Sequence, residues 1–247
     1  MSKQPAFPVM ALLCVLLLAG CASRQAADRE PNPDPFEPMN RAMFRFNDVA
    51  DRYVAEPVAR GYEKATPRAL RIGATNFFEN LKYPITIVNQ FLQGKAREGG
   101  ADLGRFLVNC TIGLAGIFDP ATEMGLKAHD EDFGQTLAVW GVSEGPFFMV
   151  PLFGPYTLTH GLGTLADNQV SLLSQYPDSS VRFRLWVWDR VQRRYRLLGT
   201  EEEIRRAYDP YLFVRDAYFQ NRRYLILDGN IPDEELFPED EFEDFEE

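Results

Sequence analysis

The sequence predicts a mainly α-helical fold. Apolar residues recur at spacings of three and four over long stretches, and two helix-start signals stand in the C-terminal part. The alternating pattern of half-buried strands is scarce. The chain has 247 residues, of which 45% are hydrophobic and 25% charged, values typical of a globular protein. These observations argue against a wholly disordered chain and against a protein with several membrane-spanning segments.

The first 20 residues predict a secretory signal peptide. Lys3 supplies a positive charge, and residues 9–18 form an apolar run that is too short to span a bilayer. The run ends in Leu18-Ala19-Gly20-Cys21, which resembles a bacterial lipobox. This implies cleavage before Cys21, covalent acyl groups such as palmitate on it, and sorting to the outer membrane, because Ala follows it rather than Asp. The alternative is an ordinary signal peptide with a chance cysteine.

The charge distribution separates a body from a tail. The net charge is −10, and residues 233–247 alone contain ten acidic and no basic side chains. We therefore expect a flexible lipidated tether over 21–33, a helical domain over 34–228 and an acidic disordered tail over 229–247. The acidic balance argues against nucleic acid as a partner.

The N-terminal half of this domain predicts three helices. The first begins at Pro38, with Met39, Met43 and Phe46 on one face, and Pro57 ends it or follows it. The second and third are expected over 67–82 and 84–94.

Two uncharged stretches follow. Residues 106–118 predict a helix that is buried or lies in one leaflet, since about 20 Å of helix does not cross a hydrocarbon core about 30 Å thick. Gly113 and Gly116 would let neighbouring backbones approach closely. Glycines and prolines interrupt residues 145–166, so we expect an apolar loop or short hairpin from Gly141 to Pro155, followed by a helix.

The C-terminal part predicts three more helices. An amphipathic helix over about 181–198 has an apolar stripe containing Trp188 amid arginines, which suits either a membrane interface or packing on the core. A capping box at Thr200 would open a short helix, and Asp209 followed by proline would cap the last one.

Signals for chemistry are few. Gly141 to Gly145 matches the nucleophile elbow of serine hydrolases around Ser143, but the expected order of acid and histidine is missing. His129 and the three acidic residues after it lack a second histidine at ligand spacing, and we interpret them as a solvated acidic turn. We expect no catalytic residue, no metal and no cofactor, and hence no enzyme.

Several motifs nonetheless resemble one known family. They comprise Asp34-Pro35-Phe36-Glu37-Pro38-Met39-Asn40-Arg41, Asn76-Phe77-Phe78-Glu79-Asn80-Leu81, Asp132-Phe133-Gly134-Gln135-Thr136-Leu137 and Asp209-Pro210-Tyr211. In this order they resemble the VacJ/MlaA phospholipid-binding lipoproteins. One departure is visible, because Thr159-His160 stands where relatives commonly have Arg-Asp.

The resemblance implies a single flat, ring-like bundle of amphipathic helices in the periplasmic leaflet of the outer membrane of a Gram-negative bacterium. Such a protein associates with a trimeric porin and removes mislocalised phospholipids from the outer leaflet. A periplasmic lipid carrier then delivers them to an inner-membrane ABC transporter complex, which maintains lipid asymmetry.

Candidate site residues follow from this expectation. Those expected to line or gate the lipid route are Asn40, Phe46, Asn47, Asn76, Phe77, Gly141, Gly145, Pro151 and Gly154. Arg184 and Arg190 are candidates for attracting phosphate. The alternatives are a structural lipoprotein that stabilises porins and a serine lipase or esterase.

Overall fold

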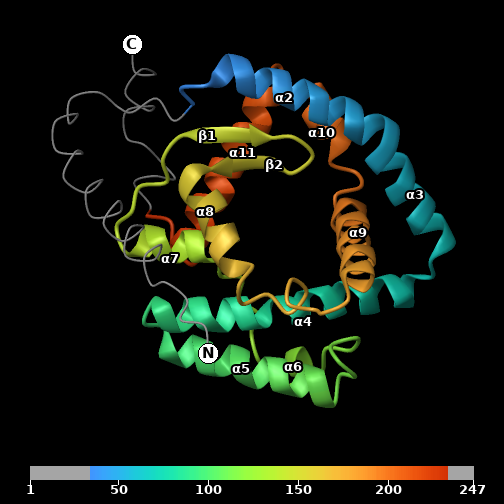
Figure 1. Ribbon diagram of the computed structural model, residues 1–247, viewed down its shortest axis with the longest axis vertical. Helices are drawn as coiled ribbons and strands as arrows, with labels where there is room; N and C mark the ends of the chain where they lie inside the picture. The colour runs from blue at the N-terminus through green and yellow to red at the C-terminus, as the bar shows by residue number, and fades with distance from the viewer. Residues whose placement is uncertain (1–33, 233–247) are drawn as a thin grey trace, which may run out of the picture. The chain divides into compact units, whose positions relative to one another are not determined.

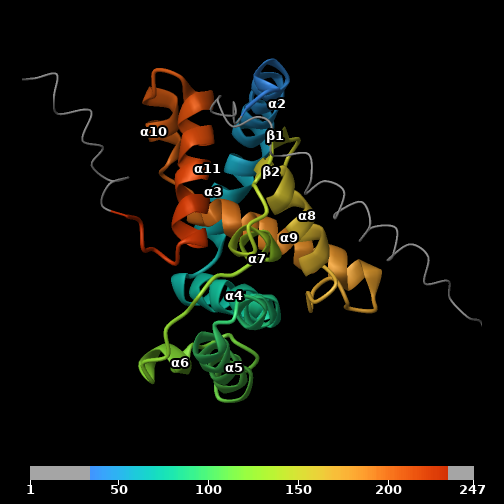
Figure 2. The same cartoon turned by 90° about the vertical axis from the view of Figure 1, so that its left-hand side faces the viewer.

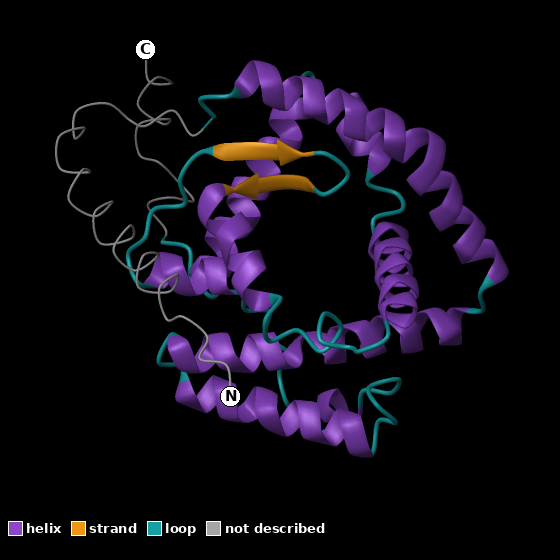
Figure 3. Ribbon diagram, viewed as in Figure 1, coloured by secondary structure: helices purple, strands orange, loops and turns teal. Residues whose placement is uncertain are grey.

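The computed structural model describes residues 34–232, which belong to one compact unit. The expected signal peptide, the expected anchor Cys21, the expected tether and residues 233–247 lie outside the described residues. The elements are α2 (Glu37–Ala50), η2 (Asp51–Ala55), α3 (Glu56–Ala65), α4 (Arg68–Leu92), α5 (Ala96–Thr111), α6 (Pro120–Glu123), α7 (Phe133–Val139), β1 (Phe147–Val150), β2 (Gly154–Thr157), α8 (Leu158–Asp167), α9 (Ser179–Arg196), α10 (Glu201–Arg206) and α11 (Pro210–Ile226). The predicted mainly α-helical class is confirmed, with one small antiparallel hairpin (Figure 3).

Within this unit the elements follow one another around a closed ring (Figure 1). The pairs in contact run from α2 through η2 to α3, then to α9, α4, α7, α8, β2 and β1, and β1 returns to α2. Helix α5 lies along α4, and α10 lies beside α11 (Figure 2). No helix in residues 34–232 has both the length and the apolarity needed to cross a membrane.

The hairpin is held to α2 by two asparagine side chains. Asn40 Nδ2 donates to the main-chain oxygen of Phe147 (3.0 Å), and the main-chain N–H of Met149 donates to Asn40 Oδ1 (2.9 Å). Two helical turns later, Asn47 makes the same pair of bonds with Val150 and Leu152. The two amides thus satisfy backbone groups of β1, which would otherwise form an unpaired sheet edge.

A small apolar core lies beside these amides. Phe147, Met149 and Tyr211 are buried, and side chains of α2 and α11 pack around them. Asp209 caps α11 as predicted, because its carboxylate accepts the N–H groups of Tyr211 and Leu212.

Two prolines expected to separate helices do not do so. Helix α2 runs on into α3 past Pro57, because the wider π turn η2 precedes it and Glu56 N–H bonds to Asp51 O, five residues back. Likewise, 67–82 and 84–94 form the single helix α4 with Pro84 inside. Buried residues lie on both sides of Pro84, so packing along the helix offsets the hydrogen bond that proline removes.

Two other expectations need correction. The stretch 106–118 is not one helix, since α5 ends at Thr111 and a turn with positive φ at Leu114, Ala115 and Gly116 follows. At Thr200 the short helix α10 forms, but the threonine side chain donates to Leu197 O instead of capping it. A short hairpin followed by a helix is confirmed, but β2 runs to Thr157, two residues beyond the expected end at Pro155.

Close approach at the two predicted glycines is confirmed. A Cβ on Gly116 would lie 2.4 Å from Cβ of Asn80, and one on Gly113 would lie 2.5 Å from the main-chain oxygens of Asn109 and Phe118. Glycine is therefore required where this turn packs on α4.

The Asn40 amide gives the first prediction. Asn40→Ala leaves the buried Phe147 oxygen and Met149 N–H without partners, so the free energy of unfolding should fall by about 3 kcal/mol. Arg45→Ala, at an exposed position on the same helix, should change it by less than about 0.5 kcal/mol. Denaturant unfolding in detergent measures both, and equal effects would contradict the proposed role of Asn40.

Candidate functional site

A cavity of about 900 Å³ lies among α4, β2, α8, α9, α11 and the segment 130–132. Its lining combines aromatic rings such as Trp186 and Tyr218 with charged groups such as Asp132, Arg190 and Arg222. Among the described residues, more polar and charged side chains are fully buried than apolar ones, while many large apolar side chains are exposed. This distribution is the reverse of the usual one for a water-soluble domain.

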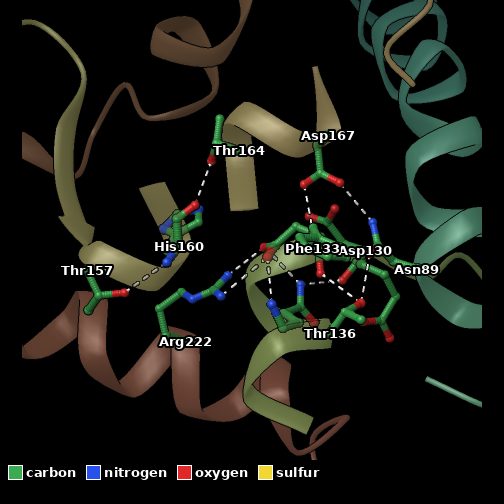
Figure 4. A network of polar contacts seen from close by, with 12 residues as sticks. Asn89, Asp130, Phe133, Thr136, Thr157, His160, Thr164, Asp167 and Arg222 are labelled. Carbon is green, nitrogen blue, oxygen red and sulfur yellow. Dashed lines mark hydrogen bonds and ion pairs between the residues drawn. The ribbon is translucent and has the colours of Figure 1, made fainter. Parts of the chain in front are cut away.

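An arginine–aspartate pair belongs to the polar lining, formed by Asp132 and by Arg222, which Figure 4 labels. Arg222 on α11 is buried and bonds Asp132 through both ends of its guanidinium (Nη1–Oδ2 2.5 Å, Nη2–Oδ1 3.4 Å). Asp132 also caps α7 by accepting the N–H of Gln135. Burial opposes ionisation of Asp132, but the attraction of Arg222 outweighs it and lowers the pKa of the carboxyl group.

A second carboxylate joins three helices beside this pair (Figure 4). Asp167 at the end of α8 accepts from Asn89 Nδ2 on α4 (2.9 Å) and from the N–H of Phe133 on α7 (2.9 Å). Thr136 Oγ1 donates to Asn89 Oδ1 (2.8 Å), which completes the link. Burial raises the pKa of Asp167.

His160 faces the same cavity and is neutral at pH 7. Burial, followed by the charge of Arg222, lowers the pKa of His160 to about 4. Its Nδ1 lies 3.0 Å from the hydroxyl of Tyr218, which already accepts the N–H of Thr157. The single tyrosine proton has two acceptors within reach, His160 Nδ1 at 3.0 Å and Thr157 Oγ1 at 3.4 Å, and the shorter contact is the one to Nδ1.

Two glycines allow this network to assemble. A Cβ on Gly163 would lie 2.3 Å from the main-chain nitrogen of Gly134, so α7 and α8 cross with their backbones in contact. A Cβ on Gly134 would also lie within about 3 Å of Asp132, His160 and Arg222. Glycine at both positions brings the charged pair and the histidine together.

The acidic segment 129–132 is not the solvated turn that the sequence suggested. Glu131 is buried and bonds Lys95 (3.0 Å) and Gln93 (2.7 Å), and His129 bonds the buried Asp102 (3.1 Å). Partners far along the chain supply these contacts, which is why local composition did not reveal them. Within residues 34–232, no group of three or more His, Cys, Asp or Glu side chains is arranged to hold a metal ion.

None of the nine candidates for the lipid route belongs to the lining of this cavity. Asn40 is buried and, like Asn47, is occupied by the hairpin, while Phe46 is exposed. Asn76 lines a second, polar cavity of about 390 Å³ between α4, α5 and α6. Phe77 packs against Trp188 of α9.

The candidates around the hairpin shape the backbone. Gly141, Gly145 and Gly154 have φ values of +87°, +70° and +90°, which favour glycine, and they flank β1 and open β2. Pro151 lies in the exposed hairpin turn. Their neighbour Phe153 does line the cavity. A gating role for these residues stays a prediction.

The two arginine candidates differ in position. Arg190 lines the cavity, whereas Arg184 is exposed and its Nε bonds only to Ser180 O of its own helix. The apolar stripe of α9 contacts α3 and α4, because Trp188 touches Phe77 and Phe78 and Tyr195 touches Tyr62, although Trp188 stays 40% exposed.

Sequence reasoning missed the central residues of the cavity. Arg222 and Asp167 fit ordinary helix-surface positions in the sequence, and only the ring brings them beside Asp132. For His160 the sequence offers one signal, because Thr159-His160 stands where relatives commonly have Arg-Asp. Ser143 lies in the loop before β1, and its main-chain oxygen accepts the hydroxyl of Thr159 (2.6 Å), so the strand-to-helix turn of a nucleophile elbow is absent around it.

The geometry defines a class: a helical ring with many exposed apolar side chains and a charged cavity. The family model described as "MlaA lipoprotein" matches residues 32–225. The chain belongs to the MlaA lipoprotein family. The "Intermembrane phospholipid transport system lipoprotein MlaA" of Escherichia coli (strain K12) is 35% identical over 225 residues, covering 89% of this chain and 88% of the relative.

Two further similarities agree with this family assignment. The lipoprotein of the same description from Haemophilus influenzae is 29% identical over 250 residues, covering 93% of this chain and 94% of the relative. A solved structure described as "Structural basis for maintenance of bacterial outer membrane lipid asymmetry" superimposes with a TM-score of 0.72 at 36% identity, covering 78% of this chain and 98% of that chain. The family expected from the motifs is thus confirmed.

The low pKa of His160 predicts a pH dependence. An unfolded histidine takes up a proton below about pH 6.5, but the folded one stays neutral down to about pH 4. His160 therefore stabilises the fold above pH 6.5, and this contribution declines as the pH falls toward 4.

We expect His160→Asn to reduce this loss. Between about pH 7.5 and about pH 5, the free energy of unfolding should fall by about 1 kcal/mol less than in the wild type, allowing for solvent screening of a partly exposed ring. Denaturant unfolding at both pH values measures the difference. Parallel losses in the two proteins would refute the assignment.

Proposed function

We propose that this protein is an outer-membrane lipoprotein that removes mislocalised phospholipids from the outer leaflet. It passes them to a periplasmic carrier for retrograde transport and so maintains lipid asymmetry. The observation that supports this most directly is the charged cavity inside a ring whose exterior is rich in exposed apolar side chains. A phospholipid has the same division, with a polar headgroup and apolar chains.

The surface supports a place in one leaflet. Exposed apolar side chains include Phe46 and Val54 on the α2–α3 side and Leu107 and Ile112 on the α5 side. Acyl chains on Cys21 would anchor the protein firmly, since each buried methylene contributes about 0.8 kcal/mol. A lipid headgroup would then cross the apolar zone inside the ring, where charged side chains replace water.

The proposed function involves partner proteins and no catalysed reaction. By the names of its relatives, the protein works within an intermembrane phospholipid transport system. We propose a trimeric porin as the membrane partner. A periplasmic lipid carrier and an inner-membrane ABC transporter complex are the later components of the proposed pathway. The protein moves phospholipid without a catalytic step and without a cofactor.

The decisive experiment blocks the cavity. Ser171 is a small residue of the lining, and Ser171→Trp places a large ring there. The matched control is Ser180→Trp, at an exposed position outside the lining. Each variant is expressed in a strain lacking the gene, and outer-leaflet phospholipid is measured on intact cells with a membrane-impermeant amine label.

We expect the deletion to raise surface phospholipid, and the wild type and Ser180→Trp to restore the normal level. Ser171→Trp should leave it raised although the protein is present and folded by circular dichroism. Full restoration by Ser171→Trp would show that lipid does not use the cavity. Normal asymmetry in the deletion strain, with an altered porin level, would favour a structural lipoprotein.

A further inference from the structure

One face of α9 forms a cationic wall of the large cavity. The lining residues of this helix recur at helical spacing and are Arg182, Trp186, Asp189, Arg190 and Arg193. Three guanidinium groups therefore share this wall with a single carboxylate.

The partners of these groups single out Arg190. Asp189 is buried and pairs with Arg193 (2.7 Å), while Arg182 Nη1 donates to Tyr176 O (2.9 Å). Within the part of the chain that the structure describes, Arg190 forms neither a hydrogen bond nor an ion pair, and its Nε is buried without a partner. Three other carboxylates of the lining have partners of their own: Asp132 pairs with Arg222, Glu131 with Lys95, and Asp167 accepts from Asn89 and Phe133.

Aromatic rings hold the Arg190 guanidinium in place. Its Cζ lies 5.3 Å from the ring centroid of Phe153, at the end of the hairpin, and 5.3 Å from that of Trp186. Cation–π contacts engage the faces of the planar guanidinium and leave its N–H groups free at the edge. Burial, together with the charge of Arg193, lowers the pKa of Arg190, so an anion arriving here would relieve an unfavourable environment.

We infer that Arg190 is the binding residue for a phosphate group inside the cavity. A guanidinium edge with free donors matches two phosphate oxygens, and a phosphodiester retains its negative charge at neutral pH. The inference rests on the proposed function, in which the phosphate belongs to a lipid headgroup. Free inorganic phosphate presents the same chemistry, and the experiment distinguishes the two sources.

The test uses the full purified chain in detergent and three variants. Arg190→Gln removes the charge, and Arg190→Lys keeps the charge but loses the planar edge. Arg184→Gln removes a charge from the exposed side of the same helix, so it controls for net charge. Arg190 makes no hydrogen bond in the described structure, so these variants should fold, which circular dichroism checks.

Calorimetry then compares three ligands: short-chain phosphatidylglycerol, the diacylglycerol with the same chains, and inorganic phosphate. We expect Arg190→Gln to weaken phosphatidylglycerol binding about 10-fold or more and to leave diacylglycerol binding unchanged. The affinity of Arg190→Lys for phosphatidylglycerol should lie between those of Arg190→Gln and the wild type. The affinity of Arg184→Gln should equal that of the wild type. Free phosphate should bind more weakly than the lipid, because it lacks the acyl chains.

The outcomes separate the inference from the function. If the wild type binds both lipids and Arg190→Gln binds phosphatidylglycerol equally well, the assignment of Arg190 is overturned while the function stands. If the wild type binds neither lipid, the proposed function fails. In that case, if inorganic phosphate binds the wild type and only the Arg190 variants lose this binding, the anion site at Arg190 still stands. If inorganic phosphate does not bind the wild type either, the anion site is overturned as well.

Discussion

The fold depends on the pairing of Asn40 with the backbone of β1. A two-stranded hairpin is marginal on its own, and its free edge needs partners. The Asn40 side chain supplies both a donor and an acceptor to that edge and also donates to Asp34 Oδ1 (2.7 Å). Asp34 in turn accepts the hydroxyl of Tyr211 on α11. One buried amide therefore fixes α2, the hairpin and α11, and so closes the ring.

The cavity, like the hairpin, depends on buried polar groups that find their partners in distant segments of the chain. Buried charges are costly unless they are paired or hydrogen-bonded, and the interior of this ring meets that requirement with contacts between distant segments. Arg222 with Asp132 and Asp167 with Asn89 are two examples. Arg190 lacks such a partner and is held by aromatic rings instead. Arg222 Nε also lacks a hydrogen bond, but both Nη atoms of Arg222 bond Asp132. Arg190 differs in having no polar partner at any nitrogen in the described structure, and this contrast is what assigns it a ligand.

Local signals predicted local features well. Asp209 caps α11, glycines lie where the turn after α5 packs on α4, and an amphipathic helix forms around Trp188. Prolines were the main source of error, because a π turn before Pro57 and packing on both sides of Pro84 override their tendency to end helices. The π turn before Pro57 is a local feature of the chain, whereas the packing on both sides of Pro84 depends on tertiary contacts.

The site was less predictable for a related reason. Asn40 and Asn47 are candidates for the lipid route in the sequence, yet their role is to satisfy the hairpin rather than to line the cavity. The cavity takes residues from elements far apart in the chain, and no periodicity reveals which of them meet. The sequence offers Arg190, like Arg184, only as an arginine able to attract phosphate, and the structure adds that Arg190 lines the cavity without a polar partner.

In the function proposed above, a phospholipid headgroup occupies the charged interior of the ring. The most direct test of this occupancy reconstitutes the protein in vesicles containing a phospholipid with a photoreactive headgroup, followed by irradiation and mass spectrometry of the cross-linked peptides. The account predicts cross-links to peptides of the cavity wall, around Trp186 to Arg190 and around Tyr218 to Arg222. Cross-links confined to exposed apolar stretches, such as that containing Met39 and Phe46, would contradict it.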